Sequence, residues 1–337
     1  MKIKNINSHI GWIDIAKGIL IALIVLGHVI SDGNNILQTW IYSFHVVGFF
    51  IINGYLKSET HYLNRVLNIK EVFNKQKSIY LLYLIFSIIF ICRIMIQAGL
   101  GMYSGHELGV FILHIITLNG EGVLWFLPVF AISEIIFYFV MKYKKIIFKV
   151  YILAVLAAIF IAKSFPFNDV LKTENILLLL VMLYIRCLIA SSLFMIGYVL
   201  CENNIFDTKW MLLGVLSVFS FINGNVDLNN LRFGNFILYY VFGIIGTFFI
   251  VMLSKIIETY SRYLKSVLTC WGENSIIIML THAIFLIYQL ISIVIKRYLL
   301  DNIVAIPIIF LLTMCVEYIL IRIWEKLRKI LLRKRKK

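Results

Sequence analysis

Residues 12–28 read W-I-D-I-A-K-G-I-L-I-A-L-I-V-L-G-H, an apolar run interrupted by Asp14, Lys17 and His28. A helix of about 20 largely apolar residues is long enough to cross the hydrocarbon core of a membrane. An ionisable side chain inside such a helix costs about 2.5–3.5 kcal/mol on insertion scales, and it usually faces other protein segments or a water-filled cavity. The stretch therefore predicts a membrane helix whose three ionisable residues serve a site or a contact within the protein.

The rest of the chain has the same apolar character. Of its 337 residues, 61% are hydrophobic and 15% are charged, and the mean hydropathy is +0.93. A soluble domain is nearer one half apolar and one quarter charged. We predict an all-α polytopic membrane protein that forms one integral-membrane domain over residues 1–337, with no separate soluble domain and no cleaved signal peptide. The longest polar stretch, residues 57–77, is expected to be a loop.

Apolar segments recur along the whole chain, and we predict about ten transmembrane helices from them. They cover approximately residues 12–30, 36–56, 78–100, 123–141, 146–163, 175–200, 210–223, 234–254, 272–294 and 302–324. Residues 106–118 are apolar but too short to span the membrane. We expect that segment to lie at the interface or to re-enter.

The formal net charge is +15, and the positions of the basic residues agree with this topology. With ten spans both termini share one side of the membrane. Of the 32 lysines and arginines, 25 lie on that side, 5 lie on the other, and Arg93 and Arg186 lie within spans. Cytoplasmic loops carry such an excess, so both termini are predicted to lie in the cytoplasm. The basic tail, residues 325–337, favours contact with anionic lipid, and no nucleic-acid partner is expected.

The cysteines lie in or beside apolar segments, and none has C-x-x-C spacing; they are Cys92, Cys187, Cys201, Cys270 and Cys315. Such cysteines are ordinarily small buried hydrophobic residues. We therefore expect no disulfide and no metal site.

The first span places its ionisable residues on one side. Lys17 and His28 are separated by eleven residues, which is about 20° more than three helical turns and about 16 Å along the axis. Asp14 lies one turn before Lys17 on the same side. Asp14 and Lys17 are either an interfacial pair that reaches toward water or part of a site. His28 lies deeper, where a neutral imidazole is either a hydrogen-bonded core residue or a proton acceptor near pH 7.

The second span carries F-H-V-V-G-F-F-I-I-N-G-Y, residues 44–55. Because the chain turns back between the two spans, His45 and His28 are expected at similar depth, with Asn53 about two turns further toward the cytoplasm. Gly48 and Gly54 are either part of this motif's function or positions that allow close helix packing.

Other polar residues stand inside later spans. Glu134 is mid-span and Arg186 is well inside another span, so the two form a candidate ion pair, either structural or functional. Trp125 stands in W-F-L-P, and His282, in I-M-L-T-H, either lines a site or makes a helix–helix hydrogen bond.

These motifs resemble the integral-membrane acyltransferase 3 family, especially its polysaccharide O-acetyltransferases of the fucose 4-O-acetylase-like branch. The resemblance runs along the whole chain. Residues 12–28 resemble the family's first-span motif, in which a basic residue precedes a histidine by eleven positions, and residues 44–55 resemble F-H-M-P-L-F-F-x-x-S-G-Y. The segments L-W-F-L-P-V-F-A-I-S-E, F-M-I-G-Y and W-G-E-N-S-I-I-I-M-L-T-H follow in the family's order. The chain departs from the pattern at Val47, at Asn53 and over residues 77–83, which lack the family's arginine and proline.

The resemblance implies transfer of an acetyl or similar short acyl group from cytoplasmic acetyl-CoA, a co-substrate rather than a bound cofactor, to a sugar hydroxyl of a lipid-linked or cell-surface glycan such as a capsule. His28 is the expected general base. Asp14 and Lys17 would orient the donor, and Lys57, Lys75 and Lys77 would attract its phosphates. His45, Asn53 or His282 would hydrogen-bond the thioester oxygen or hold His28 in one tautomer. Trp125, Glu134 and Arg186 are expected to line the site.

Two other classes of function remain open. A transporter or glycan exporter could use the buried Glu134, Arg186 and histidines for proton coupling. The chain could also be a non-catalytic partner in capsule assembly. The sequence favours the acyltransferase, leaves the acceptor sugar undetermined, and is compatible with a homo-oligomer.

Overall fold

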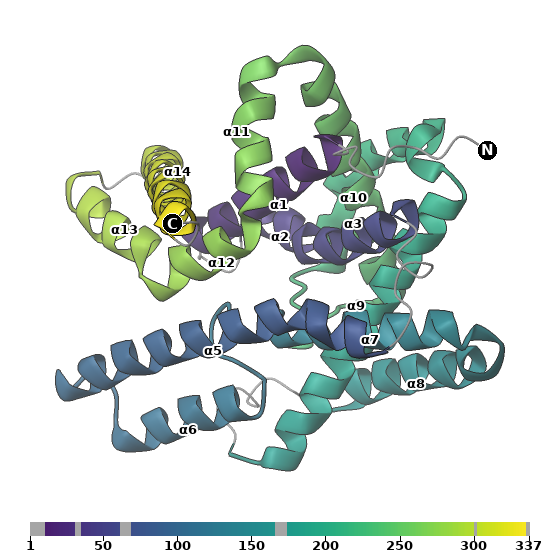
Figure 1. Cartoon of the computed structure of the whole chain (residues 1–337), viewed down its shortest axis with the longest axis horizontal. Helices are drawn as coiled ribbons and strands as arrows, with labels where there is room; N and C mark the ends of the chain where they lie inside the picture. The colour runs from purple at the N-terminus through teal and green to yellow at the C-terminus, as the bar shows by residue number, and fades with distance from the viewer. Residues whose placement is uncertain (1–10, 31–34, 61–68, 166–173, 300–301, 335–337) are drawn as a thin grey trace. The chain divides into compact units, whose positions relative to one another are not determined.

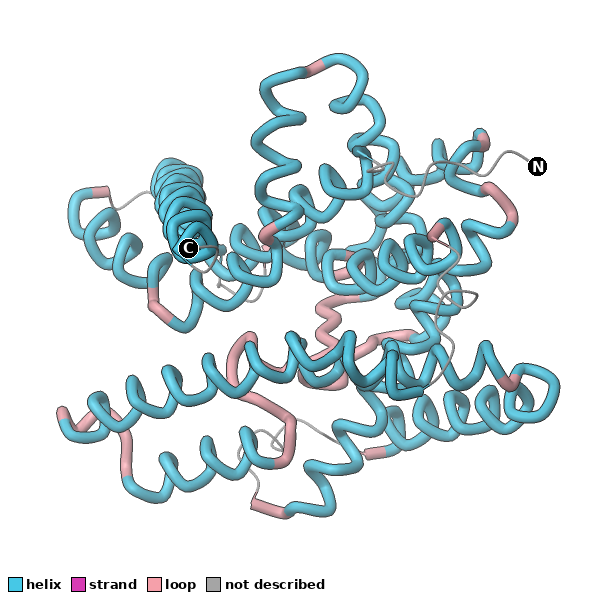
Figure 2. Tube along the Cα trace, viewed as in Figure 1, coloured by secondary structure: helices cyan, strands magenta, loops and turns pink. Residues whose placement is uncertain are grey.

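A computed structural model of the chain describes residues 11–30, 35–60, 69–165, 174–299 and 302–334. Figure 2 shows helices joined by short loops, and the described residues contain no β-strand beyond an isolated bridge between Asp227 and Arg232. They form two compact units. The larger unit comprises the described residues of Thr39–Met252, and the smaller unit comprises those of Ile10–Gln38 and Leu253–Lys337.

The smaller unit is built around α1 (Gly11–Ile30), which contacts every other long element of the unit. These elements are α11 (Arg262–Glu273), α12 (Ser275–Ile284), α13 (Ile287–Tyr298) and α14 (Asn302–Lys334). Figure 1 shows α11, α12 and α13 following one another with sharp changes of direction, and α14 lying beside α13. The end of α1 packs through Val29 against Ala305 and Ile309 of α14. A first-span helix is therefore confirmed, with Asp14, Lys17 and His28 on one continuous α-helix.

Two glycines let α1 and α11 approach at backbone distance. A Cβ atom added at Gly18 would lie 2.0 Å from the backbone oxygen of Leu268, and one added at Gly272 would lie 1.8 Å from the backbone oxygen of Asp14. Any larger residue at either position would have to displace a backbone, so these glycines fix the position of α11 along α1.

The larger unit is centred on α9 (Ile176–Glu202), against which α3 (His45–Glu59), α7 (Phe126–Lys142) and α8 (Lys144–Ser164) pack. The remaining elements are α2 (Ile36–Tyr42), α5 (Ile69–Gly99), α6 (Gly105–Ile116), the 3₁₀ helices η2 (Ile205–Asp207) and η3 (Lys209–Asn223), and α10 (Phe236–Tyr260). The division between the units falls inside α2 and inside α10. Gly54 meets the backbone of Phe194 at the α3–α9 contact, which supports a packing role for that glycine.

The helix η3 is a 3₁₀ helix of 15 residues, a length that this conformation rarely reaches. Its buried residues are Gly214, Ser217, Ser220 and Asn223, which recur at every third position. Because residues three apart eclipse one another in a 3₁₀ helix, this spacing gives η3 a single small and polar buried face. At about 2.0 Å per residue the helix is about 30 Å long, which equals the thickness of the hydrocarbon core.

Seven helices among the described residues are long and apolar enough to cross a membrane, and the bent pair α11–α12 would make eight. The polytopic all-α prediction is confirmed in this form, whereas the number ten is not. The predicted span 272–294 is not one continuous helix, because the chain bends by 73° between α11 and α12 and turns again at Leu286, which adopts a φ of 57°. The predicted span 123–141 corresponds to α7, which has 17 residues.

Two further sequence predictions concern segments outside the spans. The predicted short helix 106–118 is α6, whose first turn is capped reciprocally by Ser104 and Glu107. The predicted loop 57–77 is wrong at both ends, because α3 continues to Glu59 and α5 begins at Ile69. The basic tail 325–337 is helical up to Lys334, and its last three residues lie outside the described part of the chain.

Candidate active site

Three aromatic rings of the smaller unit form a cluster around His28. The ring centroids of His28 and His282 are 5.2 Å apart, and the ring of Tyr288 lies 6.0 Å from each of them. His282 is fully buried, whereas His28 is partly accessible. The structure thus brings together two of the predicted site residues and adds Tyr288, which was not predicted from the sequence.

Two breaks in the helices position this cluster. The bend at Asn274, whose side-chain amide donates to the carbonyl oxygen of Cys270, starts α12 in a new direction. The left-handed residue Leu286 then ends α12 and starts α13. His282 and Tyr288 stand on either side of that second break, so the reversal of the chain places both rings beside the last turn of α1, where His28 lies.

The hydrogen bonds of His282 determine which of its nitrogens carries a proton. Its Nδ1 atom lies 2.8 Å from the carbonyl oxygen of Ile278. Because a carbonyl oxygen only accepts, Nδ1 carries the hydrogen, and a neutral imidazole then has a lone pair at Nε2. That Nε2 atom is buried and has no hydrogen-bond partner among the described residues. Neutral His282 can therefore accept a hydrogen bond at Nε2 but cannot donate one there.

Glu317 is a second buried ionisable residue of this unit, and it was not predicted from the sequence. It is fully buried on α14, and its Oε2 atom accepts a hydrogen bond of 2.7 Å from the hydroxyl of Thr281, the residue before His282. The interaction ties α12 to α14 next to the histidine. The signal was present in the sequence, since Glu317 lies inside an apolar span just as Glu134 does.

Asp14 and Lys17 lie on α1 toward the end opposite His28, and both are half-buried. The backbone of Asp14 is in contact with Gly272 of α11. The eleven-residue separation on a continuous helix places Lys17 about 16 Å from His28 along the axis, as predicted. The smaller unit therefore has a charged end and a histidine end.

The predicted site residues of the second span belong to the larger unit. The Nδ1 atom of His45 donates to the carbonyl oxygen of Ile41 at 2.8 Å, and its ring lies 4.7 Å from that of Tyr42. The amide of Asn53 donates to the carbonyl oxygen of Phe49 at 2.7 Å. These bonds lie within α2–α3 itself.

The predicted ion pair between Glu134 and Arg186 is wrong. Glu134 is buried and forms its ion pair with Lys57, at 2.5 Å. Lys57, which was expected to attract donor phosphates, is thereby engaged by a carboxylate of its own unit. Lys75 and Lys77 are exposed on α5.

Arg186 is fully buried and makes contacts with neutral groups. Its Nε and Nη2 atoms donate to the carbonyl oxygen of Asn229, and its Nη1 atom donates to the side chain of Asn119 at 2.9 Å. Its guanidinium carbon also lies 5.8 Å from the ring centroid of Trp125. Arg186 thus anchors the loop that contains Asn229, which is a structural explanation for its burial.

Comparison with known proteins assigns the chain to a family. A family model described as an acyltransferase domain, that of the acyltransferase 3 family, matches residues 10–322. The comparisons with curated proteins and with solved structures found no match. Because the family match covers nearly the whole chain and both compact units, the chain belongs to the acyltransferase 3 family.

Proposed function

We propose that this member of the acyltransferase 3 family is a membrane-bound O-acyltransferase that moves an acetyl or similar short acyl group from cytoplasmic acyl-CoA to a sugar hydroxyl of a cell-surface or lipid-linked glycan. Family membership and the apolar spans support a membrane acyltransferase. We further propose the identity of the donor and of the acceptor. We also propose a ten-span topology with both termini in the cytoplasm, and location in a bacterial-type plasma membrane.

The observation that carries the proposal is the contact between His28 and His282. A sugar hydroxyl is a poor nucleophile until a base removes its proton. His28 is partly accessible, whereas His282 is buried and presents an Nε2 lone pair. When the acceptor binds, we propose that a small rotation of the two rings brings an N–H of His28 to Nε2 of His282, so that the other ring nitrogen of His28 takes the hydroxyl proton.

The reaction then needs no covalent enzyme intermediate. As the proton passes to His28, the sugar oxygen forms a bond to the thioester carbonyl carbon, and the carbon–sulfur bond breaks when the tetrahedral intermediate collapses. The CoA thiolate leaves and takes the proton back from the imidazolium of His28. Tyr288, whose hydroxyl is a donor, is a candidate for stabilising the charge on the carbonyl oxygen.

The transporter alternative loses its main support. It would use the buried Glu134, Arg186 and histidines for proton coupling, but Glu134 is engaged by Lys57, and Arg186 is held by Asn119 and Asn229. The observations therefore favour catalysis over proton-coupled transport.

Incubation of membranes with labelled acetyl-CoA tests the proposal. Glycan that becomes labelled by the wild-type protein, and not by a His28→Ala variant, is the expected result. His106→Ala is a matched control, because His106 is an exposed histidine whose ion pair with Glu174 lies on the protein surface. Labelling that survives His28→Ala would exclude His28 as the base, and loss of glycan export without any labelling would indicate a transporter.

A further inference from the structure

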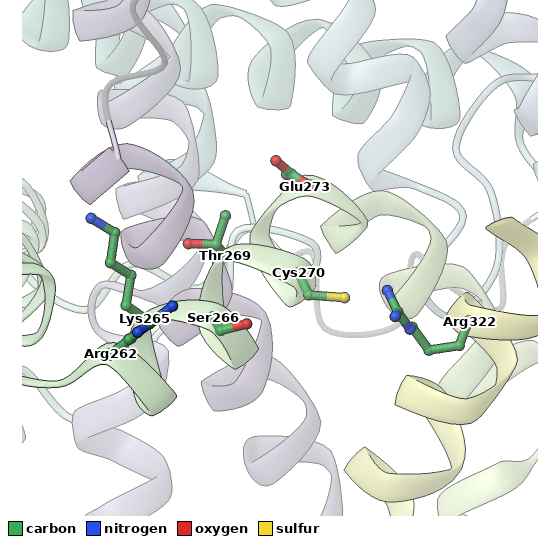
Figure 3. Close-up of a pocket in the computed structure, with 7 residues that line it drawn as sticks. All are labelled: Arg262, Lys265, Ser266, Thr269, Cys270, Glu273 and Arg322. Atoms are coloured by element: carbon green, nitrogen blue, oxygen red, sulfur yellow. The ribbon is translucent and has the colours of Figure 1, made fainter.

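We propose that a pocket between α11 and α14 of the smaller unit binds the phosphate groups of the acyl-CoA donor. The inference rests on the proposed function. The pocket has a volume of about 380 Å³ and is lined by residues of α11 and by Arg322 of α14. Figure 3 shows the side chains around it.

The lining of the pocket favours a phosphorylated ligand. Arg262, Lys265 and Arg322 contribute three positive charges, against one carboxylate from Glu273. Lys265 is also 3.4 Å from Glu258. A guanidinium offers a planar fork of donors that matches the oxygens of a phosphate, which makes arginine the preferred residue for this recognition.

Polar side chains on one face of α11 complete the pocket. Ser266 and Cys270 are four residues apart and therefore lie one above the other on the helix. In Figure 3 the hydroxyl of Ser266 and the thiol of Cys270 both point toward the guanidinium of Arg322 on α14. Thr269 supplies a second hydroxyl. Guanidinium groups combined with hydroxyl donors are suited to binding a diphosphate or a phosphate monoester.

The position of the pocket relative to His28 fits the length of the donor. Gly272, in the last turn of α11, touches the backbone of Asp14, so the pocket lies toward the charged end of α1. His28 is fourteen residues further along the same helix, which is about 21 Å. Acyl-CoA carries its phosphates and its thioester at opposite ends of a long flexible arm. A site with separate phosphate and histidine ends is what such a donor requires.

The predicted topology places the pocket on the cytoplasmic side of the membrane. Arg262, Lys265 and Arg322 all belong to the segments that the charge distribution assigns to the cytoplasm. This is the compartment from which acyl-CoA arrives. The lysines first expected to bind the donor, Lys57, Lys75 and Lys77, belong to the larger unit, and Lys57 is paired with Glu134.

A phospholipid headgroup shares the phosphate chemistry, so the experiment must separate the two sources. The purified full-length protein in neutral detergent is titrated with labelled acetyl-CoA at low salt, and dephospho-CoA and phosphatidylglycerol are then tested as competitors. The variants are Arg262→Gln and Arg322→Gln. Arg297→Gln is the matched control, because Arg297 is an exposed arginine of the same unit outside the pocket.

We expect each pocket variant to weaken acetyl-CoA binding about tenfold or more, because each loses a charge-assisted hydrogen bond to phosphate. The control should bind as the wild type does, and phosphatidylglycerol should compete poorly. Unchanged affinity in both pocket variants would overturn the pocket while leaving the proposed function intact. Equal competition by phosphatidylglycerol would reassign the pocket to lipid. A wild-type protein that does not bind acetyl-CoA at all would refute both the pocket and the proposed donor.

Discussion

The imidazole rings of His28 and His282 lie 5.2 Å apart between centroids, at an interplanar angle of 54°. They come from opposite ends of the sequence, and α1 and α12 bring them together inside one compact unit. Because the Nδ1 atom of His282 is held by the carbonyl of Ile278, the two rings are not equivalent. One is a buried acceptor, and the other is partly accessible.

This asymmetry predicts that His282 positions His28 rather than reacting itself. His282→Leu should lower kcat about 10²-fold or more, because leucine offers no lone pair that could orient the imidazole of His28. KM for acetyl-CoA should change little, since His282 is not expected to contact the donor. Steady-state kinetics with purified protein, with His106→Leu as the control, measure both constants. A rise in KM alone would contradict the positioning role.

The close contact between α1 and α11 predicts a strong effect of a single methyl group. In Gly18→Ala the new Cβ atom would collide with the backbone oxygen of Leu268, and neither backbone can move without disturbing the other. We expect a loss of about 1–3 kcal/mol in stability, measured as a lower midpoint of thermal unfolding in detergent. Gly109→Ala is the control, because a Cβ atom added at Gly109 would meet nothing within 4 Å. Equal midpoints for the two variants would refute the packing argument.

Hydropathy and helical periodicity predicted much of what lies within single helices. The apolar spans, the geometry of α1 and the short helix α6 all depend on residues close in sequence. The broken segment 272–294 was predicted as one span because its overall hydropathy is high, although Asn274 and Ser275 are typical residues of a helix boundary. The spacing of Gly214, Ser217 and Ser220 was likewise a readable sign of a 3₁₀ helix.

Contacts between residues that are distant in the sequence were not predictable in the same way. Glu134 could be matched with any buried cation, and the sequence offered no reason to prefer Lys57 over Arg186. The main partner of Arg186 is the backbone oxygen of Asn229. Because every residue carries a backbone oxygen, the sequence does not indicate which one Arg186 contacts. The site residues of α1 were recognisable because their spacing on one helix is itself informative.

The hydrogen bond between Thr281 and Glu317 predicts an energetic coupling next to His282. Thr281→Val and Glu317→Leu each remove one partner, and both should destabilise the protein, because the remaining polar group stays buried. In the double variant the loss should be smaller than the sum of the two single losses, by about 0.5–1.5 kcal/mol. Thermal unfolding of the four proteins measures this coupling. Strict additivity would show that the two side chains do not interact.

The ion pair between Lys57 and Glu134 predicts which charge reversal can be rescued. Lys57→Glu and Glu134→Lys should each reduce the amount of folded protein in the membrane, because each leaves two like charges at a buried site, and breaking a buried pair costs about 3–5 kcal/mol. The double variant that exchanges both residues restores opposite charges and should recover accumulation. The matched control exchanges Glu134 with Arg186. These two residues form no ion pair in the described part of the chain, so this variant should not recover accumulation in the membrane. Quantitative detection of the full-length protein in membranes distinguishes the outcomes, and rescue by the Glu134–Arg186 exchange instead would show that the pairing of Lys57 with Glu134 is incorrect.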